Sequence, residues 1–175
     1  KRFDDAMTAF LEAKALLRPQ APRYLAELKI LRARLKVMEA NVSAGRFKRW
    51  CDAGAELMPP RRLALLCGHA RSGTTLLEQV LDSHPEIVSA EETTIFLDDA
   101  FAPLKCSQPP DAYMLPVLEG AGIPALQQAR AASFRAMDLS VGSPVADRLL
   151  LDKNPVLTFM IPAFIRIGPE TKFLI

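Results

Sequence analysis

The chain has 175 residues, half of them hydrophobic, which is enough to bury the core of one domain plus a small appendage. Its 22 Lys and Arg side chains against 20 Asp and Glu give a net charge of +2, which does not point to a nucleic-acid partner, and none is expected. The charge is uneven, because residues 1–62 carry 14 basic and 7 acidic side chains and the rest carry 8 and 13. Two regions of different character are therefore predicted.

The cysteine usage favours a reducing compartment. Cys51, Cys67 and Cys106 are odd in number, widely spaced and without a metal-ligand pattern. No apolar run approaches the roughly 20 residues that a membrane-spanning helix needs. We therefore expect a cytoplasmic protein with no membrane span in this chain. Because the chain starts inside a helical pattern at Lys1 and stops inside an apolar strand at Ile175, it is expected to be cut at both ends.

The first region is predicted to be helical. Apolar side chains recur at spacings of three and four along residues 3–17, and Pro19 stops the run. The alternation of small Ala6 and Ala13 with bulky Phe10 resembles the second helix of a tetratricopeptide repeat (TPR). Helices of this kind would offer a surface to a protein partner.

A second amphipathic helix is predicted from Tyr24 to about Gly45, with basic residues that are interpreted as a solvated face rather than an anion-binding surface. Consecutive prolines within residues 58–62 cannot continue a helix and mark a boundary. The predicted domains are residues 1–58, a TPR-like tail with a connecting helix, and residues 59–175, an α/β domain.

The second domain opens with a strand, a glycine-bounded turn and a helix. Residues 62–68, RLALLCG, form a short apolar run that is typical of a strand buried on both faces. The turn Gly68–Gly73 precedes residues 74–84, TTLLEQVLDSH, whose apolar side chains lie on one helix face. Because the first N–H groups of a helix have no partner within it, they bind anions. The sequence therefore predicts an anion site in the turn.

The turn lacks the lysine of nucleotide-hydrolase phosphate loops. In the frame G-x-x-x-x-G-K-[ST] that lysine would stand at position 74, where the chain has Thr74 followed by Thr75. Hydrolases and kinases use this lysine to stabilise the phosphates during transfer. The nearby cation is Arg71, whose planar guanidinium fits two anionic oxygens. The loop is suited to phosphate-like oxygens but to a different transfer.

Three stretches of the second domain resemble the sulfotransferases that use a phosphosulfate donor, including the tyrosylprotein branch and the bacterial enzymes linked to TPR repeats. Residues 70–93, ARSGTTLLEQVLDSHPEIVSAEET, resemble the 5′-phosphosulfate loop and the segment after it. Residues 149–157 and 168–175 resemble later segments, so the likeness runs from about residue 63 to 175. One departure is Ala70, where the family commonly has proline, and we expect it to loosen the turn slightly.

The resemblance implies a P-loop-like α/β fold, a three-layer parallel sheet with helices on both faces. It implies the donor 3′-phosphoadenosine 5′-phosphosulfate (PAPS), no metal, and an acceptor hydroxyl on a protein tyrosine, a glycan or a small molecule. In the family, an arginine and a serine shortly after the strand that here ends at Ile175 bind the 3′-phosphate. This chain alone is therefore expected to bind the donor weakly or not at all.

Site residues are carried over position by position. Residues that match the family's phosphosulfate ligands are Arg71, Ser72, Gly73, Thr74 and Thr75. Glu92 matches the catalytic base of the tyrosylprotein branch, and Lys153 matches the lysine near the transferred sulfuryl group. The resemblance implies that Arg71 and Lys153 stabilise the leaving phosphate.

Strand ends are predicted to meet beside the anion site. A second parallel strand over Ile87–Ser89 would bring Glu91 and Glu92 to the edge that carries the loop. A third strand would bring to the same edge Asp152, Lys153 and Asn154. Between these strands, residues 98–124 are proline-rich and are predicted to be irregular, with a helical pattern over residues 125–139.

Other interpretations stay open. Glu91 and Glu92 could simply favour a helix N-terminus through the macrodipole. Asp152, after an apolar strand, could be the magnesium-side aspartate of a P-loop nucleotide kinase or hydrolase. A third possibility is a TPR-type scaffold whose α/β domain is inactive.

Overall fold

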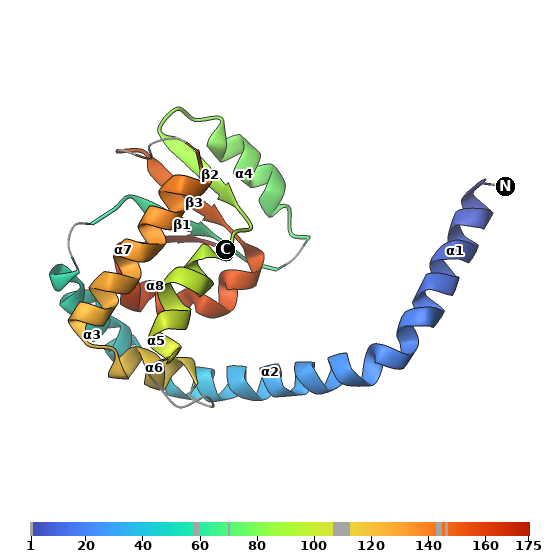
Figure 1. Ribbon diagram of the computed structural model, residues 1–175, viewed down its shortest axis with the longest axis horizontal. Coiled ribbons are helices and arrows are strands. Elements are labelled where there is room, and N and C mark those ends of the chain that lie inside the picture. The colour runs from blue at the N-terminus through green and yellow to red at the C-terminus, as the bar shows by residue number, and fades with distance from the viewer. Residues whose placement is uncertain (1, 58–59, 70, 107–112, 143–144, 146) are drawn as a thin grey trace. The chain divides into compact units, whose positions relative to one another are not determined.

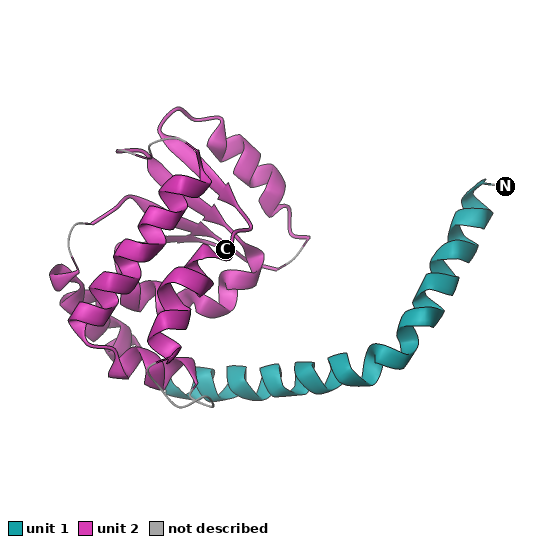
Figure 2. Cartoon of the chain, in the orientation of Figure 1, with its two compact units in different colours: residues 1–41 teal, residues 42–175 magenta. Residues whose placement is uncertain are grey.

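The computed structural model describes residues 2–57, 60–69, 71–106, 113–142, 145 and 147–175. The chain divides into two compact units, Lys1–Asn41 and Val42–Ile175 (Figure 2). The second unit contains the sheet and every predicted site residue.

The first unit consists of helix α1 (Arg2–Leu17), a 3₁₀ turn (Arg18–Gln20) and helix α2 (Ala21–Asn41). Both predicted helices are present, and the turn between them contains Pro19. Neither helix fully buries a side chain, and along the predicted apolar faces Phe3, Phe10 and Leu25 are exposed, whereas Leu31, Leu35 and Met38 are half-buried. The TPR-like character of this unit stays a prediction. No helix among the described residues is long and apolar enough to cross a membrane.

The domain boundary predicted after residue 58 stays a prediction. The boundary between the compact units is at residues 41 and 42. It lies before helix α3 (Ala44–Ala53), which begins at a Ser43 cap whose hydroxyl accepts the Arg46 amide. Trp50 of α3 is buried, and α3 packs against helix α8 (Ile161–Ile167). Burial of the tryptophan thus joins α3 to the α/β unit.

The sheet has four parallel strands in the order β2-β3-β1-β4 (Figure 1). Their bounds are β1 (Leu63–Leu66), β2 (Ile87–Glu91), β3 (Leu149–Lys153) and β4 (Lys172–Leu174). Lys153, the last residue of β3, pairs in register with Leu66 of β1 and Glu91 of β2. The carboxyl ends of three strands therefore lie at one edge, as predicted.

Helices cover both faces of the sheet, which confirms the three-layer α/β fold. On one face, helix α4 (Thr74–Asp82) contributes Leu81 to a cluster of apolar side chains that includes Leu66 and Leu151. On the other face lie helix α7 (Ile123–Ser140) and α8. The ring of Phe164 from α8 stacks there on Phe96, with ring centroids 3.6 Å apart.

The proline-rich segment over residues 98–124 is helical where the structure describes it, contrary to the prediction of an irregular segment. It contains a π-helical turn (Phe96–Phe101), α5 (Ala102–Cys106), α6 (Met114–Gly120) and the start of α7. Pro103 is the second residue of α5 and Pro116 lies in the first turn of α6, positions where an absent N–H costs little. Buried apolar side chains in each piece stabilise these helices.

Gly54 offers a test of how α3 joins the α/β unit. A Cβ added at Gly54 would clash with the ring of Pro169, whereas one added at Gly45 in α3 meets nothing within 4 Å. We expect Gly54→Ala to lower the free energy of unfolding by about 1–3 kcal/mol, as overpacking does. The control Gly45→Ala should raise it by up to about 1 kcal/mol, because alanine favours a helix. Urea denaturation measures both, and equal effects would contradict the packing described.

Candidate functional site

The predicted anion loop is shaped by backbone conformations that glycine favours. Gly68 has φ +136° and Gly73 has φ +88°, and between them Arg71 has φ +69°. The hydroxyl of Thr158 accepts a hydrogen bond from the Gly68 amide at 2.9 Å, which fixes the start of the turn, and donates to the Pro155 carbonyl at 2.7 Å. Ala70 lies outside the described residues.

The first turn of α4 presents backbone amides to this loop. The first helical hydrogen bond runs from the Leu77 amide to the Gly73 carbonyl, at 3.1 Å. The amides of residues 74–76 precede that bond and have no partner within the helix. Of the loop amides, that of Ser72 is used by the turn itself, because it donates to the His69 carbonyl at 3.2 Å. The Arg71 side chain is exposed beside the turn.

Lys153 lies at the centre of the site, with its side chain fully buried. Its ammonium nitrogen is 2.9 Å from Oε1 of Glu92, 3.2 Å from Oε1 of Glu91, 3.4 Å from Oε2 of Glu78 and 3.5 Å from Oγ1 of Thr75. We call these five residues the Lys153 cluster. The prediction that the ends of β2 and β3 meet beside the anion loop is confirmed, since Thr75 stands in the first turn of α4.

The cluster keeps the lysine charged. Burial alone would lower the pKa of Lys153, but its hydrogen bonds to Glu92 and Glu91, with the negative charge of Glu78, raise that pKa above its ordinary value. A protonated amine here can stabilise negative charge that develops on a bound substrate.

Glu92 is held by its backbone as well as by its side chain. Its amide donates to the Lys153 carbonyl at 2.7 Å, and its φ is +46°, an uncommon value for a residue other than glycine. Its side chain is 60% exposed, and that of Glu91 is 66% exposed. Both carboxylates form ion pairs with Lys153. This contact explains the two adjacent glutamates without the alternative that they stabilise a helix N-terminus.

Glu78 and Ser89 belong to the site but were not predicted from the sequence. Glu78 is buried on α4, and its Oε1 accepts a hydrogen bond from the Ser89 hydroxyl on β2. The available signals were the three-residue spacing from Thr75 to Glu78 and the two-residue spacing from Ser89 to Glu91. Such spacings place side chains on one face but do not say which strand the helix covers.

Asp152 and Asn154 stand with Lys153 at the predicted edge, but their side chains do not join the Lys153 cluster. Successive side chains of a strand point to opposite faces, so Asp152 points away from α4. Asn154 instead forms the cap of a 3₁₀ turn (Pro155–Met160), where its Oδ1 accepts the Val156 amide. Its amide group donates to the Thr93 carbonyl at 2.8 Å.

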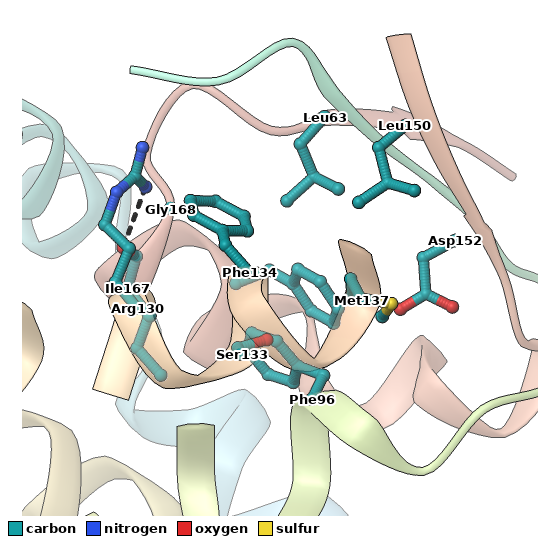
Figure 3. A pocket seen from close by; sticks show the side chains of 11 residues that line it. Leu63, Phe96, Arg130, Ser133, Phe134, Met137, Leu150, Asp152, Ile167 and Gly168 are labelled. Atoms are coloured by element: carbon teal, nitrogen blue, oxygen red, sulfur yellow. Dashed lines mark hydrogen bonds between the residues drawn. The ribbon is translucent and has the colours of Figure 1, made fainter. Parts of the chain in front are cut away.

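Asp152 lies against a small pocket on the other face of the sheet, with a volume of about 20 Å³ (Figure 3). Figure 3 places its carboxylate at one end of the pocket beside Met137, with Arg130 at the other end. Neither carboxylate oxygen has a hydrogen-bond partner among the residues described. This position is separate from the anion loop, which weighs against a magnesium-side aspartate.

The sequence of residues 64–175, more than half of the chain, matches a family described as the sulfotransferase family. The chain belongs to this sulfotransferase family. None of the curated proteins matches the chain. Membership identifies the α/β domain as that of a transferase and supports sulfuryl transfer in general over the nucleotide hydrolase.

Among the described residues of the sulfotransferase domain, Asp152 is a strongly perturbed acid. Burial, and secondarily the charge of Glu78, raises the pKa of Asp152 to about 7. Between pH 4 and 7 the unfolded chain releases this proton while the folded chain retains it. The free energy of unfolding should therefore fall as pH rises through this range, by about 1.4 kcal/mol per unit from this group.

We expect Asp152→Asn to remove that fall in the free energy of unfolding. Between pH 4 and pH 8 the wild type should therefore lose a few kcal/mol more of this free energy than the variant loses. The matched control is Asp98→Asn, because Asp98 is exposed. Urea denaturation at pH 4 to 8 measures all three proteins. Parallel curves for wild type and Asp152→Asn would contradict an ionisable buried carboxyl at this position.

Proposed function

We propose that the protein transfers a sulfuryl group from PAPS to an acceptor hydroxyl. The observation that carries the proposal is the position of Lys153, whose ammonium contacts both Thr75 at the anion loop and Glu92 at the end of β2. A cation, an anion-binding turn and an exposed carboxylate thus share one site. These are the groups that a transfer between a phosphosulfate and an alcohol requires.

The loop would bind the 5′-phosphosulfate of the donor. The amides of residues 74–76 and the positive end of the α4 dipole favour an anion in the turn. The proposed ligands are Arg71, Ser72, Gly73, Thr74 and Thr75. Arg71, exposed beside the turn, would contact two anionic oxygens with its planar guanidinium.

In the proposed reaction the acceptor oxygen attacks sulfur, and its proton passes to the carboxylate of Glu92. The bond between sulfur and the bridging oxygen breaks, and that oxygen leaves with the electron pair as part of adenosine 3′,5′-bisphosphate, called 3′,5′-phosphoadenosine here. Arg71 and Lys153 stabilise its negative charge. The products are a sulfate ester and the nucleotide.

The acceptor would be a protein tyrosine, a glycan or a small molecule that approaches the exposed side of Glu92. We further propose that the protein acts in the cytoplasm and that its TPR-like helices recruit a protein partner. These proposals rest on the family resemblance and on the cysteine usage, not on the geometry of the site.

Ligand titration separates this proposal from the nucleotide kinase. We expect the natural full-length protein, studied by calorimetry, to bind 3′,5′-phosphoadenosine at least tenfold more tightly than magnesium ATP. The loop has Thr74 where a kinase has its phosphate-binding lysine. The reverse preference would overturn the proposal.

Replacing Glu92 tests the base. Glu92→Gln keeps the shape of the side chain but cannot accept the proton, so turnover should fall about 10²–10⁴-fold, whereas the Kd for 3′,5′-phosphoadenosine should change little. Glu86→Gln is the matched control, because Glu86 is an exposed glutamate paired with Arg62 outside the Lys153 cluster. Turnover of Glu92→Gln equal to that of the control would remove Glu92 from the mechanism.

A further inference from the structure

We propose that Glu78, oriented by Ser89, is a positioning residue that holds the Lys153 ammonium beside the anion loop while the donor and the acceptor occupy the site. The inference deepens the proposed function and rests on it. It assigns different tasks to the three carboxylates around one amine, according to their burial.

Burial distinguishes Glu78 from its two neighbours. The side chain of Glu78 is 7% exposed, against 66% for Glu91 and 60% for Glu92. Water and salt screen the attraction between an amine and exposed carboxylates, whereas a buried pair is screened much less. Although Glu78 is the most distant of the three from the amine, at 3.4 Å, its interaction with Lys153 is the one that solvent weakens least.

The elements that carry Glu78 also fix its direction. Glu78 and Thr75 lie one turn apart on α4, and both contact the Lys153 nitrogen, so the helix that presents the loop amides also locates the amine. The Ser89 hydroxyl donates to Oε1 of Glu78. The other oxygen, Oε2, is the one that contacts Lys153.

The charges of the cluster explain why a buried partner is needed. Three carboxylates and one ammonium give the cluster a net charge of −2, and the phosphosulfate adds further negative charge. When the donor binds, the ammonium of Lys153 must direct its N–H groups towards the oxygens of the donor. Because Glu91 and Glu92 are exposed, water can solvate these two carboxylates when they lose their contacts with the ammonium. Glu92 then becomes free to accept the acceptor's proton. Glu78 keeps its contact and holds the amine protonated and in place.

The test compares Glu78→Gln and Ser89→Ala with the control Glu86→Gln in the natural full-length protein. Supporting groups behind a reactive centre typically contribute about 10–100-fold, so we expect kcat of Glu78→Gln to fall by that factor. The Kd for 3′,5′-phosphoadenosine should change by less than about threefold, because Glu78 lies outside the loop that binds the donor. Ser89→Ala should show a smaller loss in the same direction, and the control none.

The pH dependence distinguishes positioning from a purely structural role. Without the Glu78 charge the pKa of Lys153 should fall, so the alkaline limb of kcat/KM should move to lower pH in Glu78→Gln and, to a lesser extent, in Ser89→Ala. NMR titration of ¹³C-methylated lysines, with the Lys153 signal assigned by its loss in Lys153→Arg, should show the same shift without any turnover.

Each outcome decides the inference. Shifts of the limb and of the NMR titration, with donor affinity retained, support it. A wild type that transfers sulfate while Glu78→Gln has unchanged pH profiles overturns the inference and leaves the proposed function standing, even if the variant is less thermostable. A wild type that binds 3′,5′-phosphoadenosine but transfers no sulfate to any acceptor overturns the proposed function, and the positioning role of Glu78 with it.

Discussion

A buried ammonium is stable in a protein only when negative charge surrounds it, and Lys153 meets this condition by drawing three elements to one point. Glu91 and Glu92 come from the end of β2, and Glu78 comes from α4. The parallel register, which sets Lys153 opposite Leu66 and Glu91, makes the meeting possible. The helix that supplies Glu78 also supplies the anion-binding amides. One ion cluster therefore couples the geometry of the loop to the geometry of the candidate base.

Asp152, the residue before Lys153, is also buried but favours the uncharged form. Asp152 and Lys153 are adjacent, but strand alternation sends their side chains to different faces of the sheet. Lys153 finds carboxylates and stays charged, whereas Asp152 finds an apolar pocket with no hydrogen-bond partner among the residues described there, and its pKa rises. Two buried ionisable groups at one strand end thus favour different charge states, because their partners lie on different layers of the fold.

The features of the fold and of the candidate site that depend on local sequence patterns or on the order of parallel strands could be predicted from the sequence. The strand–turn–helix around Arg71 follows from apolar periodicity and two glycines, and the meeting of Glu92 with Lys153 follows from parallel strands. Glu78 was missed because its role depends on which strand α4 covers, a tertiary fact. Asp152 lies at the predicted edge, but the prediction did not use the alternation of side chains along a strand, which places its carboxylate on the other face of the sheet. The second compact unit begins before α3, upstream of the prolines, because the burial of Trp50 is a tertiary contact that local proline signals do not register.

Backbone strain connects the two sides of the site. Outside glycine, the described residues with left-handed φ are Arg71 and Glu92, at +69° and +46°. Each such conformation costs of order 1 kcal/mol and persists only where the surroundings determine it. Thr158 fixes the start of the turn that contains Arg71, and the hydrogen bond to the Lys153 carbonyl fixes Glu92. The strained residues are the proposed donor ligand and the proposed base. The rigid parallel sheet between them is what allows the chain to hold both in conformations that a free peptide would avoid.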